Sequence, residues 1–568
     1  METRSPERTL PRGATTVRAV VWSTRLVGLL TLAAVVFPVA RRRFPDPLSL
    51  WFALPVQATV AGAAVAVVAG VCLVLLATGL RRRKRRAWQI AVLLTAVIAA
   101  LHLVFRHGEL AAGGAICLFV VLIVYRSEFT ALPDPAMGRW RALLVLLQLL
   151  ITGAAIDLAI LLVNHRRELG HPTFGERADH ALLALVGISG PIRFRAEILD
   201  DLTATIGLVF GLGAVVLAGY YLLRSAEPAP SLAPADESRM RALLDAHSDS
   251  LGYFALRRDK SVVFSPSGKS AVTYRVLAGV ALTSGDPLGD AEAWPGAIDE
   301  YLARCRKQAW VPAVLGCSAQ AGTVWSRHGM EILELGDEAV VDATAFSVEG
   351  RRMRGVRQAV NRVRRAGYAV QVRRSAALSA GERTQLATLA DEWRGTSTER
   401  GYSMALSRTA GGDDPNCVLV TASREGKVRG ILQFVPWGDD GLSLDLMRRD
   451  VTDNGLNEFM IASLLERCPD LGVCQVSLNF AMFRAALERG ERLGAGPVAR
   501  LWARALRLCS RWWQIESLYR FNAKFAPTWT PRYLAFPEVW DLPRIALAAL
   551  EAEGFGGRPP ALLRILRR

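Results

Sequence analysis

Residues 441–460 read GLSLDLMRRDVTDNGLNEFM, and this stretch decides how the second half of the chain folds. Its first part, Leu442–Met447, alternates between the two faces as a β-strand does. Asp453–Gly455 (DNG) then marks a turn or a helix N-cap. The apolar residues that follow predict a helix with Glu458 in its first turns. The sequence therefore predicts a strand that leads through a short turn into a helix.

Two charged side chains lie at the end of this predicted strand. Asp445 and Arg448 are three residues apart, at a strand-to-helix junction of the kind where α/β folds bind ligands. A carboxylate and a guanidinium could together hold a substrate that carries both charges. A structural ion pair explains the same two residues equally well.

The length and the charge distribution indicate a membrane part and a separate soluble part. A chain of 568 residues is too long for one hydrophobic core. Residues 1–224 hold 24 Lys/Arg against 13 Asp/Glu, whereas the remainder holds 45 against 39. The basic excess therefore concentrates in the short loops of the apolar half, where it determines membrane orientation.

Six segments in this half are apolar and long enough to cross a bilayer, which takes roughly 20 residues. They are Val20–Ala40, Leu54–Leu80, Trp88–Phe105, Leu110–Tyr125, Leu143–Val163 and Thr203–Leu223. The basic run Arg81–Arg86 predicts that the loop after the second segment is cytosolic, so that both termini are cytosolic. The triplet Arg41–Arg43 would then face outward, against the same rule.

Polar features inside the apolar half are few. Asp157 falls within the fifth segment, where a carboxylate either serves function, for example by lining a lipid headgroup cavity, or has a partner in helix packing. Gly207 and Gly211 form a GxxxG pattern in the sixth segment, which predicts a helix contact. Six spans with so few charges argue against an ion-driven transporter.

The second half is predicted to be α/β or α+β. A Pro/Ala-rich linker, 225–240, precedes a domain over 241–545 and a basic tail over 546–568. The predicted elements include a hairpin and two further strands around a helix, and a second set of strands and a helix follows. Their bounds are 261–264, 270–274, 276–282, 294–308 and 311–317 in the first set, and 418–423, 428–435, 442–447, 456–467 and 473–479 in the second.

Between the two sets, Glu349–Gly367 predicts a cationic helix. Met353, Val356, Val360 and Val363 recur at helical spacing, so one face is buried. The other faces carry seven arginines, at positions 351, 352, 354, 357, 362, 364 and 365. Such a face suits RNA phosphates or anionic lipid headgroups, and a merely solvated face is the alternative.

Lys524 stands out because only six of the 69 basic residues are lysine. It lies among aromatic residues in the segment Arg520–Phe525, where it could steady a phosphate or an oxyanion. Snorkelling from an aromatic cluster is the alternative. The eight cysteines form no CxxC pair and the seven histidines are scattered, so we predict no metal site and no nucleophilic His or Cys.

Six motifs occur together in an order that resembles the catalytic domain of phosphatidylglycerol lysyltransferases, also called lysyl-phosphatidylglycerol synthases or multiple peptide resistance factors. The resemblance is closest to the actinobacterial form and covers about residues 240–545. The motifs are SGDPLGD (284–290), ELGDEAVVD (334–342), FSVEGRRMRGVRQAVNR (346–362), SLDLMRRD with GLNEFM (443–460), VSLNFAMF (476–483) and FNAKFAPTWTPRYL (521–534).

The resemblance implies a tandem acetyltransferase-like (GNAT-like) fold on the cytosolic face of a bacterial cytoplasmic membrane. It implies transfer of an aminoacyl group, most simply lysyl, from aminoacyl-tRNA to phosphatidylglycerol in the bilayer. The product would be a cationic lipid of the kind that gives resistance to cationic antimicrobial peptides, and no cofactor is implied. Lysyl-tRNA synthetase is expected as a separate protein, flippase activity is not expected, and a homo-oligomer is a further option.

The same resemblance implies roles for individual residues. Asp445 and Arg448 match the family's D-x-x-R pair at the aminoacyl site, and Lys524 matches its essential lysine. We assign Asp445 to the α-ammonium, Arg448 to a phosphate or the tRNA end, and Lys524 to the oxyanion. Further substrate-binding candidates are Glu399 and Glu516, for a lysine side-chain amine, and Arg354, Arg357, Arg362 and Asn479.

Two other functions stay open from the sequence. One is a different tRNA-dependent aminoacyltransferase, with alanine or ornithine as the amino acid or a peptidoglycan precursor as the acceptor. The other is a membrane-anchored protein without catalytic activity, which binds RNA or anionic lipid through the arginine-rich helix.

Overall fold

The chain divides into two compact units in a computed structural model. One unit is Met1–Ala226 with Arg306–Trp310, and the other comprises Glu227–Cys305 and Val311–Arg568. The structure describes residues 14–41, 60–105, 109–131, 137–186, 190–195, 197–223, 227–229, 232–244, 249–395, 401–450, 453–482 and 515–554.

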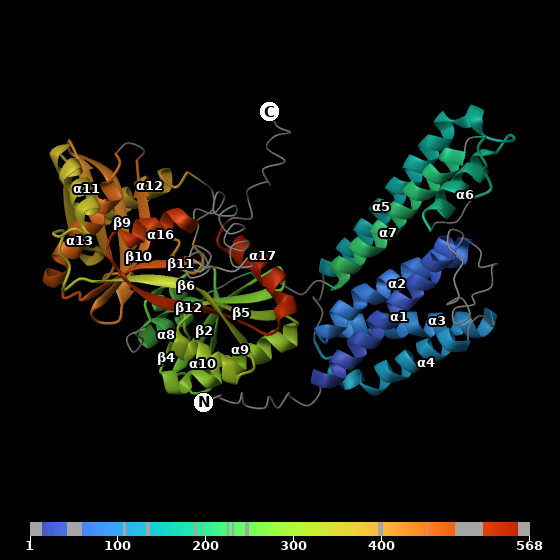
Figure 1. The fold of residues 1–568 in the computed structure, drawn as a ribbon, viewed down its shortest axis with the longest axis horizontal. Coiled ribbons are helices and arrows are strands. Elements are labelled where there is room, and N and C mark those ends of the chain that lie inside the picture. The colour runs from blue at the N-terminus through green and yellow to red at the C-terminus, as the bar shows by residue number, and fades with distance from the viewer. Residues whose placement is uncertain are drawn as a thin grey trace. The chain divides into compact units, whose positions relative to one another are not determined.

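The first unit is helical, and all six predicted apolar segments contain a helix. The helices pack as antiparallel neighbours, α1 on α2, α3 on α4 and α5 on α7, with the short α6 beside the last pair (Figure 1). Their bounds are α1 Ala14–Arg41, α2 Val60–Arg81, α3 Arg85–Phe105, α4 Glu109–Val124, α5 Met137–Val163, α6 Phe174–Ala184 and α7 Glu197–Leu223.

Two of these helices have the length and composition of membrane spans. Among the described residues, Trp140–Val163 in α5 and Leu202–Leu223 in α7 meet both criteria. The apolar parts of α2 and α4, Gly70–Arg81 and Gly113–Val124, are shorter. The prediction of six spans therefore stays a prediction, while the helices themselves are observed.

The glycines of α7 allow a close helix contact. A Cβ atom on Gly207 would lie 2.5 Å from the carbonyl carbon of Ala184, and one on Gly211 would lie 1.8 Å from the carbonyl oxygen of Leu185. The end of α6 therefore packs directly on the α7 backbone, which confirms the contact that the GxxxG pattern predicts. Asp157 in α5 is fully buried, and neither of its carboxylate oxygens has a hydrogen-bond partner among the described residues.

The second unit is built on one continuous sheet. Within the described residues the strand order is β1-β2-β3-β5-β12-β6-β11-β10-β9-β8-β7, with β4 paired to β2. The strands are β1 Ser261–Phe264, β2 Ser270–Leu277, β3 Val280–Ser284, β4 Leu288–Gly289, β5 Val311–Cys317, β6 Glu331–Asp342, β7 Ala369–Arg374, β8 Val418–Arg424, β9 Lys427–Trp437, β10 Gly441–Arg449, β11 Gln475–Met482 and β12 Thr528–Phe536.

The sheet contains the same arrangement twice. In the first half, antiparallel β2 and β3 are followed by helix α9 (Trp294–Gln308) and by β5, which pairs parallel with β3. In the second half, antiparallel β9 and β10 are followed by α13 (Leu456–Leu471) and by β11, which pairs parallel with β10. This repeat agrees with the two successive α/β units that the sequence predicts.

Other helices complete the unit. Helix α11 (Arg354–Arg365) lies beside α13, and α17 (Leu542–Ala552) packs near β3 (Figure 1). The remaining helices are α8 Pro234–Leu244, α10 Ala319–Arg327, α12 Ala380–Glu392 and α16 Ile515–Ala523. Two apolar clusters fill the interior, one centred on the first repeat and one on the second, the latter including Val356, Phe459 and Phe525.

Several predicted boundaries are wrong for local backbone reasons. The strand predicted over 276–282 is interrupted, because Ala278 and Gly279 both adopt positive φ (48° and 69°) in a two-residue hairpin between β2 and β3. The arginine-rich helix starts at Arg354 rather than Glu349, since Gly350 turns the chain with φ 86°.

Boundaries at the two ends of the predicted soluble domain also differ. Helix α8 begins inside the predicted linker, with Pro234 as its first residue, where a missing N–H costs nothing. Helix α17 takes in the first part of the predicted tail and buries Ile545, Ala548 and Ala552. Residues 555–568 of that tail lie outside the described residues.

A buried ionic network joins the two repeats at the centre of the sheet. Arg532 of β12 donates to Glu338 of β6 through Nε at 2.8 Å and pairs through Nη1 with Asp249 at 2.6 Å. The Arg532 and Glu338 side chains are almost fully buried. Ser477 of β11 donates its hydroxyl to the other oxygen of Glu338. Strands from both repeats therefore share one buried charge cluster.

Asp286 lies next to this network and is unusually hard to ionise. Burial and the neighbouring Asp249 raise the pKa of Asp286 to about 7, although Arg532 and hydrogen bonds from Ser318 oppose the rise. The Ser318 backbone N–H and hydroxyl both donate to this carboxyl group, at 2.7 Å and 2.6 Å.

We predict that Asp286 makes the protein less stable as the pH rises. An unfolded Asp loses its proton near pH 4, whereas the folded one keeps it to about pH 7, so stability falls between these values. Replacing Asp286 with Asn should remove this loss. The melting temperature of Asp286→Asn, measured in detergent, should rise relative to wild type from pH 5 to pH 8.

The exposed carboxylate of Asp470 provides the control for this measurement. Asp470→Asn should shift the melting temperature equally throughout the range from pH 5 to pH 8. A difference between Asp286→Asn and wild type that stays constant from pH 5 to pH 8 would contradict the assignment.

Candidate active site

The second repeat contains a break in the sheet where β10 and β11 separate. The two strands pair only from Gly441↔Gln475 to Ser443↔Ser477. Beyond these pairs, β10 continues along β9 and β11 continues along β6, each with a register shift. We call this region the strand split and define it by Leu444–Arg449 on β10 and Leu478–Met482 on β11. Asp445 and Asn479 lie at its beginning.

Asp445 holds a loop of the protein in place. Asp445 lies where the pairing register of β10 with β9 shifts, between Leu444 and Leu446. One carboxylate oxygen accepts the backbone N–H of Leu406 at 2.7 Å, and the other accepts the side-chain N–H of Gln433. Both oxygens of the carboxylate predicted to bind an ammonium therefore already accept hydrogen bonds from the protein.

Gln433 extends this arrangement and was missed from the sequence. The fully buried side chain donates to the Arg408 carbonyl at 3.0 Å and accepts the Ala410 N–H at 2.6 Å. Asp445 and Gln433 together fix residues 406–410 over the sheet. An isolated Gln in an apolar strand pattern, as here in KVRGILQFVPW, is the only sequence signal for this role.

Asn479 bridges the strand split. Its Nδ2 donates to the Leu444 carbonyl of β10 at 2.5 Å, and its backbone N–H donates to the Ser477 hydroxyl at 3.2 Å. The residue adopts φ 67°, which Asn tolerates better than most residues. The structure therefore places this predicted binding residue beside Asp445.

Helix α16 brings the predicted lysine to the same region. Asn522 in the last turn of α16 donates to the Leu478 carbonyl of β11 at 3.1 Å. Lys524, just after the helix, forms an ion pair of 2.7 Å with Glu458 in the first turn of α13, and its ammonium lies 5.4 Å from the Phe521 ring centre. Because the Lys524 side chain is 45% exposed, it can also reach a bound molecule.

The start of α13 falls within the predicted N-cap stretch Asp453–Gly455. Gly455 takes that position with φ 94°, while the Asp453 carboxylate accepts the Tyr368 hydroxyl. A Cβ atom on Gly455 would lie 2.9 Å from the Arg362 guanidinium and 3.0 Å from the Ala359 Cβ, so only glycine fits. A pocket of about 290 Å³ opens here, lined by Arg362, Val363, Ala366, Asp453 and Asn454.

The arginine-rich helix presents charge that the described residues do not neutralise. Five of the seven arginines over residues 351–365 belong to α11. Six of the seven are exposed, and no carboxylate of the described residues forms an ion pair with any of them. Arg357 is half-buried and donates to the Val348 and Gly350 carbonyls, and Arg362 donates to the Asn454 carbonyl at 2.9 Å. Of the three arginines predicted to bind substrate, Arg354 is therefore the one whose side chain forms no hydrogen bond to the described residues.

Two further candidates cannot be placed. Glu399 lies outside the described residues, and Glu516 belongs to α16 but its side chain is not described. Among the described residues, no group of three His, Cys, Asp or Glu side chains is arranged to hold a metal ion.

Arg448 is in place at the end of β10, and its Nε is buried. The structure thus assembles Asp445, Arg448, Asn479 and Lys524 around the strand split and the start of α13, although they come from three separate parts of the sequence. The site lacks any cofactor-binding glycine loop among these residues. Its chemistry is that of hydrogen-bond donors and acceptors.

Comparisons with known proteins agree on one family. The sequence model of the family described as "Phosphatidylglycerol lysyltransferase, C-terminal" matches residues 241–536, just over half of the chain. The lysylphosphatidylglycerol biosynthesis bifunctional protein LysX of Mycobacterium tuberculosis is 40% identical over 98% of the chain and 49% of its own length. LysX of Mycobacterium marinum is 42% identical over 85% of the chain and 45% of its own length.

The chain thus spans about half the length of the curated relatives that it matches. Among solved structures, the C-terminal domain of a lysylphosphatidylglycerol synthetase described as putative, from Agrobacterium fabrum, matches with a TM-score of 0.48 and 20% identity, over 57% of this chain and 99% of that one. L-PGS from Bacillus licheniformis matches with a TM-score of 0.46 and 20% identity, over 59% and 99%.

We predict that Asp445→Asn loosens the loop over the sheet. The new amide has only one oxygen, so its NH₂ group would face either the Leu406 N–H or the NH₂ group of Gln433, and Gln433 cannot turn without breaking its bonds to residues 408 and 410. The loss should be about 1–3 kcal/mol of unfolding free energy. Trypsin should then cleave faster after Arg408, which is only 17% exposed in the side chain.

The exposed Asp439 on the neighbouring turn provides the control. Asp439→Asn should leave both the melting temperature and the rate of cleavage after Arg408 unchanged. Equal protection of Arg408 in Asp445→Asn and wild type would contradict the proposed anchoring.

Proposed function

The chain belongs to the phosphatidylglycerol lysyltransferase family, and we propose that it transfers a lysyl group from aminoacyl-tRNA to phosphatidylglycerol. The family match over residues 241–536 is the observation that carries this proposal. The assembly of Asp445, Asn479 and Lys524 around the strand split supports it, because polar groups from distant segments converge there.

The proposed reaction is a direct ester exchange. A glycerol hydroxyl of the lipid attacks the aminoacyl carbonyl carbon, the bond from that carbon to the tRNA ribose oxygen breaks, and the hydroxyl proton passes to the leaving ribose oxygen. The Lys524 ammonium donates a hydrogen bond to the carbonyl oxygen as negative charge develops on it. Glu458 orients this ammonium, and Arg448 neutralises a phosphate of the lipid or of the tRNA end.

No covalent enzyme intermediate is needed for this chemistry. Burial raises the pKa of the Cys468 thiol to about 12 and also raises that of Cys417, so neither thiol is nucleophilic near neutral pH. Among the described residues of the strand split there is no histidine to act as a base. The lipid hydroxyl is therefore the nucleophile in our proposal.

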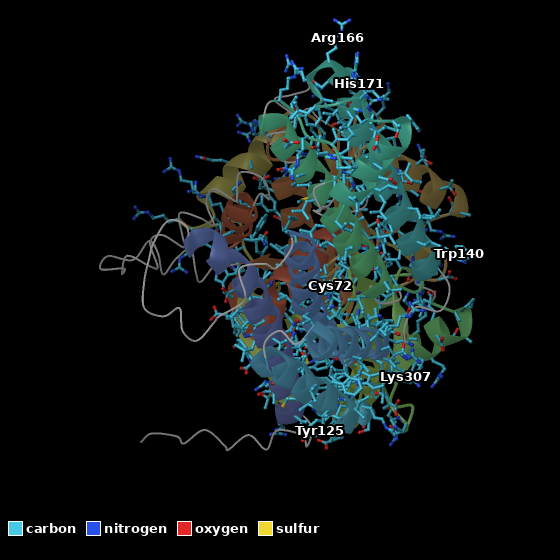
Figure 2. The ribbon with its side chains drawn as sticks, turned by 90° about the vertical axis from the view of Figure 1, so that its right-hand side faces the viewer. Cys72, Tyr125, Trp140, Arg166, His171 and Lys307 are labelled. Carbon is cyan, nitrogen blue, oxygen red and sulfur yellow. The ribbon has the colours of Figure 1, made fainter. Side chains whose placement is uncertain are left out.

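The helical unit supplies the link to the lipid. The 24 residues Trp140–Val163 would extend about 36 Å as a helix, enough for a hydrocarbon core of about 30 Å. Trp140 near one end is 70% exposed, and Arg166 and His171 lie beyond the other end (Figure 2). Aromatic and basic residues at the two ends of an apolar helix are typical of membrane interfaces. We propose a multi-pass protein of the bacterial cytoplasmic membrane with the second unit in the cytosol.

The exposed arginine face of α11 is the proposed contact for the tRNA donor. Its guanidinium groups are unpaired with acids among the described residues, so they can bind phosphates without first breaking ion pairs. Arg362, at the pocket beside the start of α13, links this face to the site.

The first test is the lipid product itself. The chain, expressed in a bacterium without aminoacylated lipids, should produce a phosphatidylglycerol species heavier by one lysyl residue, detected by mass spectrometry. Lys524→Met should reduce this species by at least about a hundredfold, as removal of an oxyanion donor does. Lys427→Met, which removes an exposed lysine on a β-turn, should not change it.

A charge-swapped pair separates catalysis from structure. Lys524→Glu combined with Glu458→Lys keeps the ion pair but moves the ammonium to α13, so the lipid product should not recover. Recovery would show that only the ion pair matters. A lipid product with a different mass increment would show that the protein transfers an amino acid other than lysine. If correctly inserted protein forms no new lipid, the result would favour the binding-protein alternative.

We also predict a smaller salt dependence of tRNA binding when the arginine face is reduced. Arg351→Gln with Arg354→Gln removes two exposed guanidinium groups and should lower the slope of log affinity against log salt by about 2, or about 1 for each lost phosphate contact. Filter binding of tRNA over a range of salt concentrations measures the slope. Arg467→Gln, exposed on α13, is the matched control, and an unchanged slope in the double variant would contradict the assignment.

A further inference from the structure

Two buried amide groups at the strand split have oxygen atoms without a hydrogen-bond partner. They belong to Asn479 of β11 and Asn522 of α16, which are 9% and 0% exposed. Neither Oδ1 atom accepts a hydrogen bond from any of the described residues. The Asn522 side chain contacts Leu478 of β11, and Asn479 is the next residue along that strand. Two unpaired acceptors therefore lie in one small region.

The orientation of each side-chain amide is fixed by the hydrogen bond that its NH₂ group donates. The Nδ2 atom of Asn479 donates to the Leu444 carbonyl, and that of Asn522 donates to the Leu478 carbonyl. A reversed amide would place an oxygen against a carbonyl oxygen, so each Oδ1 must point away from the backbone. The backbone at Asn479 is held in turn by Ser477, whose hydroxyl bonds to Glu338 in the buried network.

Buried oxygen atoms without hydrogen-bond donors lower the stability of the fold unless a bound ligand donates to them. Buried polar groups in folded proteins nearly always have partners, and an unsatisfied acceptor is destabilising. A third amide oxygen, that of Asn457, is buried beside Glu458 without a partner among the described residues, and hence lies close to the Lys524 ion pair. Three such acceptors indicate that the bound group is itself a donor of several hydrogen bonds.

We propose that the Oδ1 atoms of Asn479 and Asn522 bind the α-ammonium group of the aminoacyl donor. This inference rests on the proposed function and names the residues that recognise the donor. Amide oxygens accept from an ammonium but repel a phosphate or a carboxylate. Asn457 is the candidate for the third N–H of the same ammonium.

Position along the chain distinguishes the α-ammonium from the ε-ammonium of a lysyl group. Asn522 is two residues from Lys524, which faces the reacting carbonyl in our mechanism. The α-nitrogen is separated from that carbonyl carbon by one carbon atom, whereas the ε-nitrogen is separated by five. The group bound next to Lys524 is therefore the α-ammonium.

This assignment changes the role of Asp445. Its two oxygens hold Leu406 and Gln433, so it acts as a positioning residue and adds a negative charge near the ammonium. Every amino acid has an α-ammonium, so these amides recognise an aminoacyl ester in general. Selection of the side chain must come from other residues.

The test compares two donors on the full-length protein in detergent with phosphatidylglycerol. One donor is lysyl-tRNA and the other is Nα-acetyl-lysyl-tRNA, in which the ammonium is replaced by a neutral amide. Wild type should prefer the free amine by at least about tenfold, and Asn522→Leu should reduce this preference about ten- to hundredfold, since a hydrogen bond to a charged group contributes roughly 1.5–3 kcal/mol. The ratio of two rates does not depend on how much of the variant is folded.

Two further variants complete the design. Asn164→Leu removes an amide that also donates to a backbone carbonyl, but in the helical unit, and should leave the preference unchanged. If Asn522→Leu is inactive with both donors, Asn457→Leu decides, because it removes the third proposed acceptor and should lower the preference for lysyl-tRNA. Asn457→Leu that is active and keeps the full preference would overturn the inference.

The outcomes separate this inference from the proposed function. Wild type that uses both donors equally, or Asn522→Leu that keeps the full preference, would overturn the inference while leaving lysyl transfer established. Wild type that forms no aminoacylated lipid from either donor would overturn the proposed function, and this inference with it.

Discussion

The buried ion pair between Arg532 and Glu338 is the interaction on which the rest of the second unit depends. Arg532 is on β12, a late strand that inserts between β5 and β6 of the first repeat, and it also binds Asp249 and the Ser250 hydroxyl. Glu338 also accepts the Ser477 hydroxyl, which in turn accepts the backbone N–H of Asn479 at the strand split. Removing one member of such a buried pair typically costs about 3–5 kcal/mol, because the remaining charge has no solvent. One ionic cluster therefore joins the two repeats and fixes the backbone of the candidate site.

The sequence predicts the local elements well because their signals are local. The strand from Gly441, the helix from Leu456 and the exposed cationic face of α11 all follow from periodicity and turn residues. The position of β12 does not, since no local pattern records a pairing between residues about 190 positions apart, such as Trp529 and Ala339. The motif resemblance predicted Asp445, Arg448 and Lys524 as site residues, and the structure brings their segments together.

Other features of the site could be found only in three dimensions. Gln433 is a polar residue in an otherwise apolar strand, and only the fold shows that it holds the loop together with Asp445. Asn522 is part of the motif FNAKF, yet its importance comes from burial and from an unpaired oxygen. The N-cap falls on Gly455 of the predicted stretch Asp453–Gly455, and only the fold shows that the Asp453 carboxylate bonds Tyr368, a residue 85 positions earlier in the chain. In each case a long-range contact replaced the local interaction that the pattern suggests.

These features assign a separate role in the proposed enzyme to each of three parts of the chain. In our proposal, apolar helices anchor the protein in the bilayer, arginines of α11 bind the tRNA, and the strand split provides neutral acceptors next to one lysine. The central claim is that the aminoacyl end of the donor binds in the strand split. The most direct measurement is an experimental structure of the chain with a non-hydrolysable lysyl-amide analogue of the tRNA 3′ end. Our account predicts the α-ammonium within hydrogen-bond distance of Asn479 and Asn522 and the carbonyl oxygen toward Lys524. An analogue bound elsewhere, for example with its ammonium outside the split in the pocket at Arg362, would contradict it.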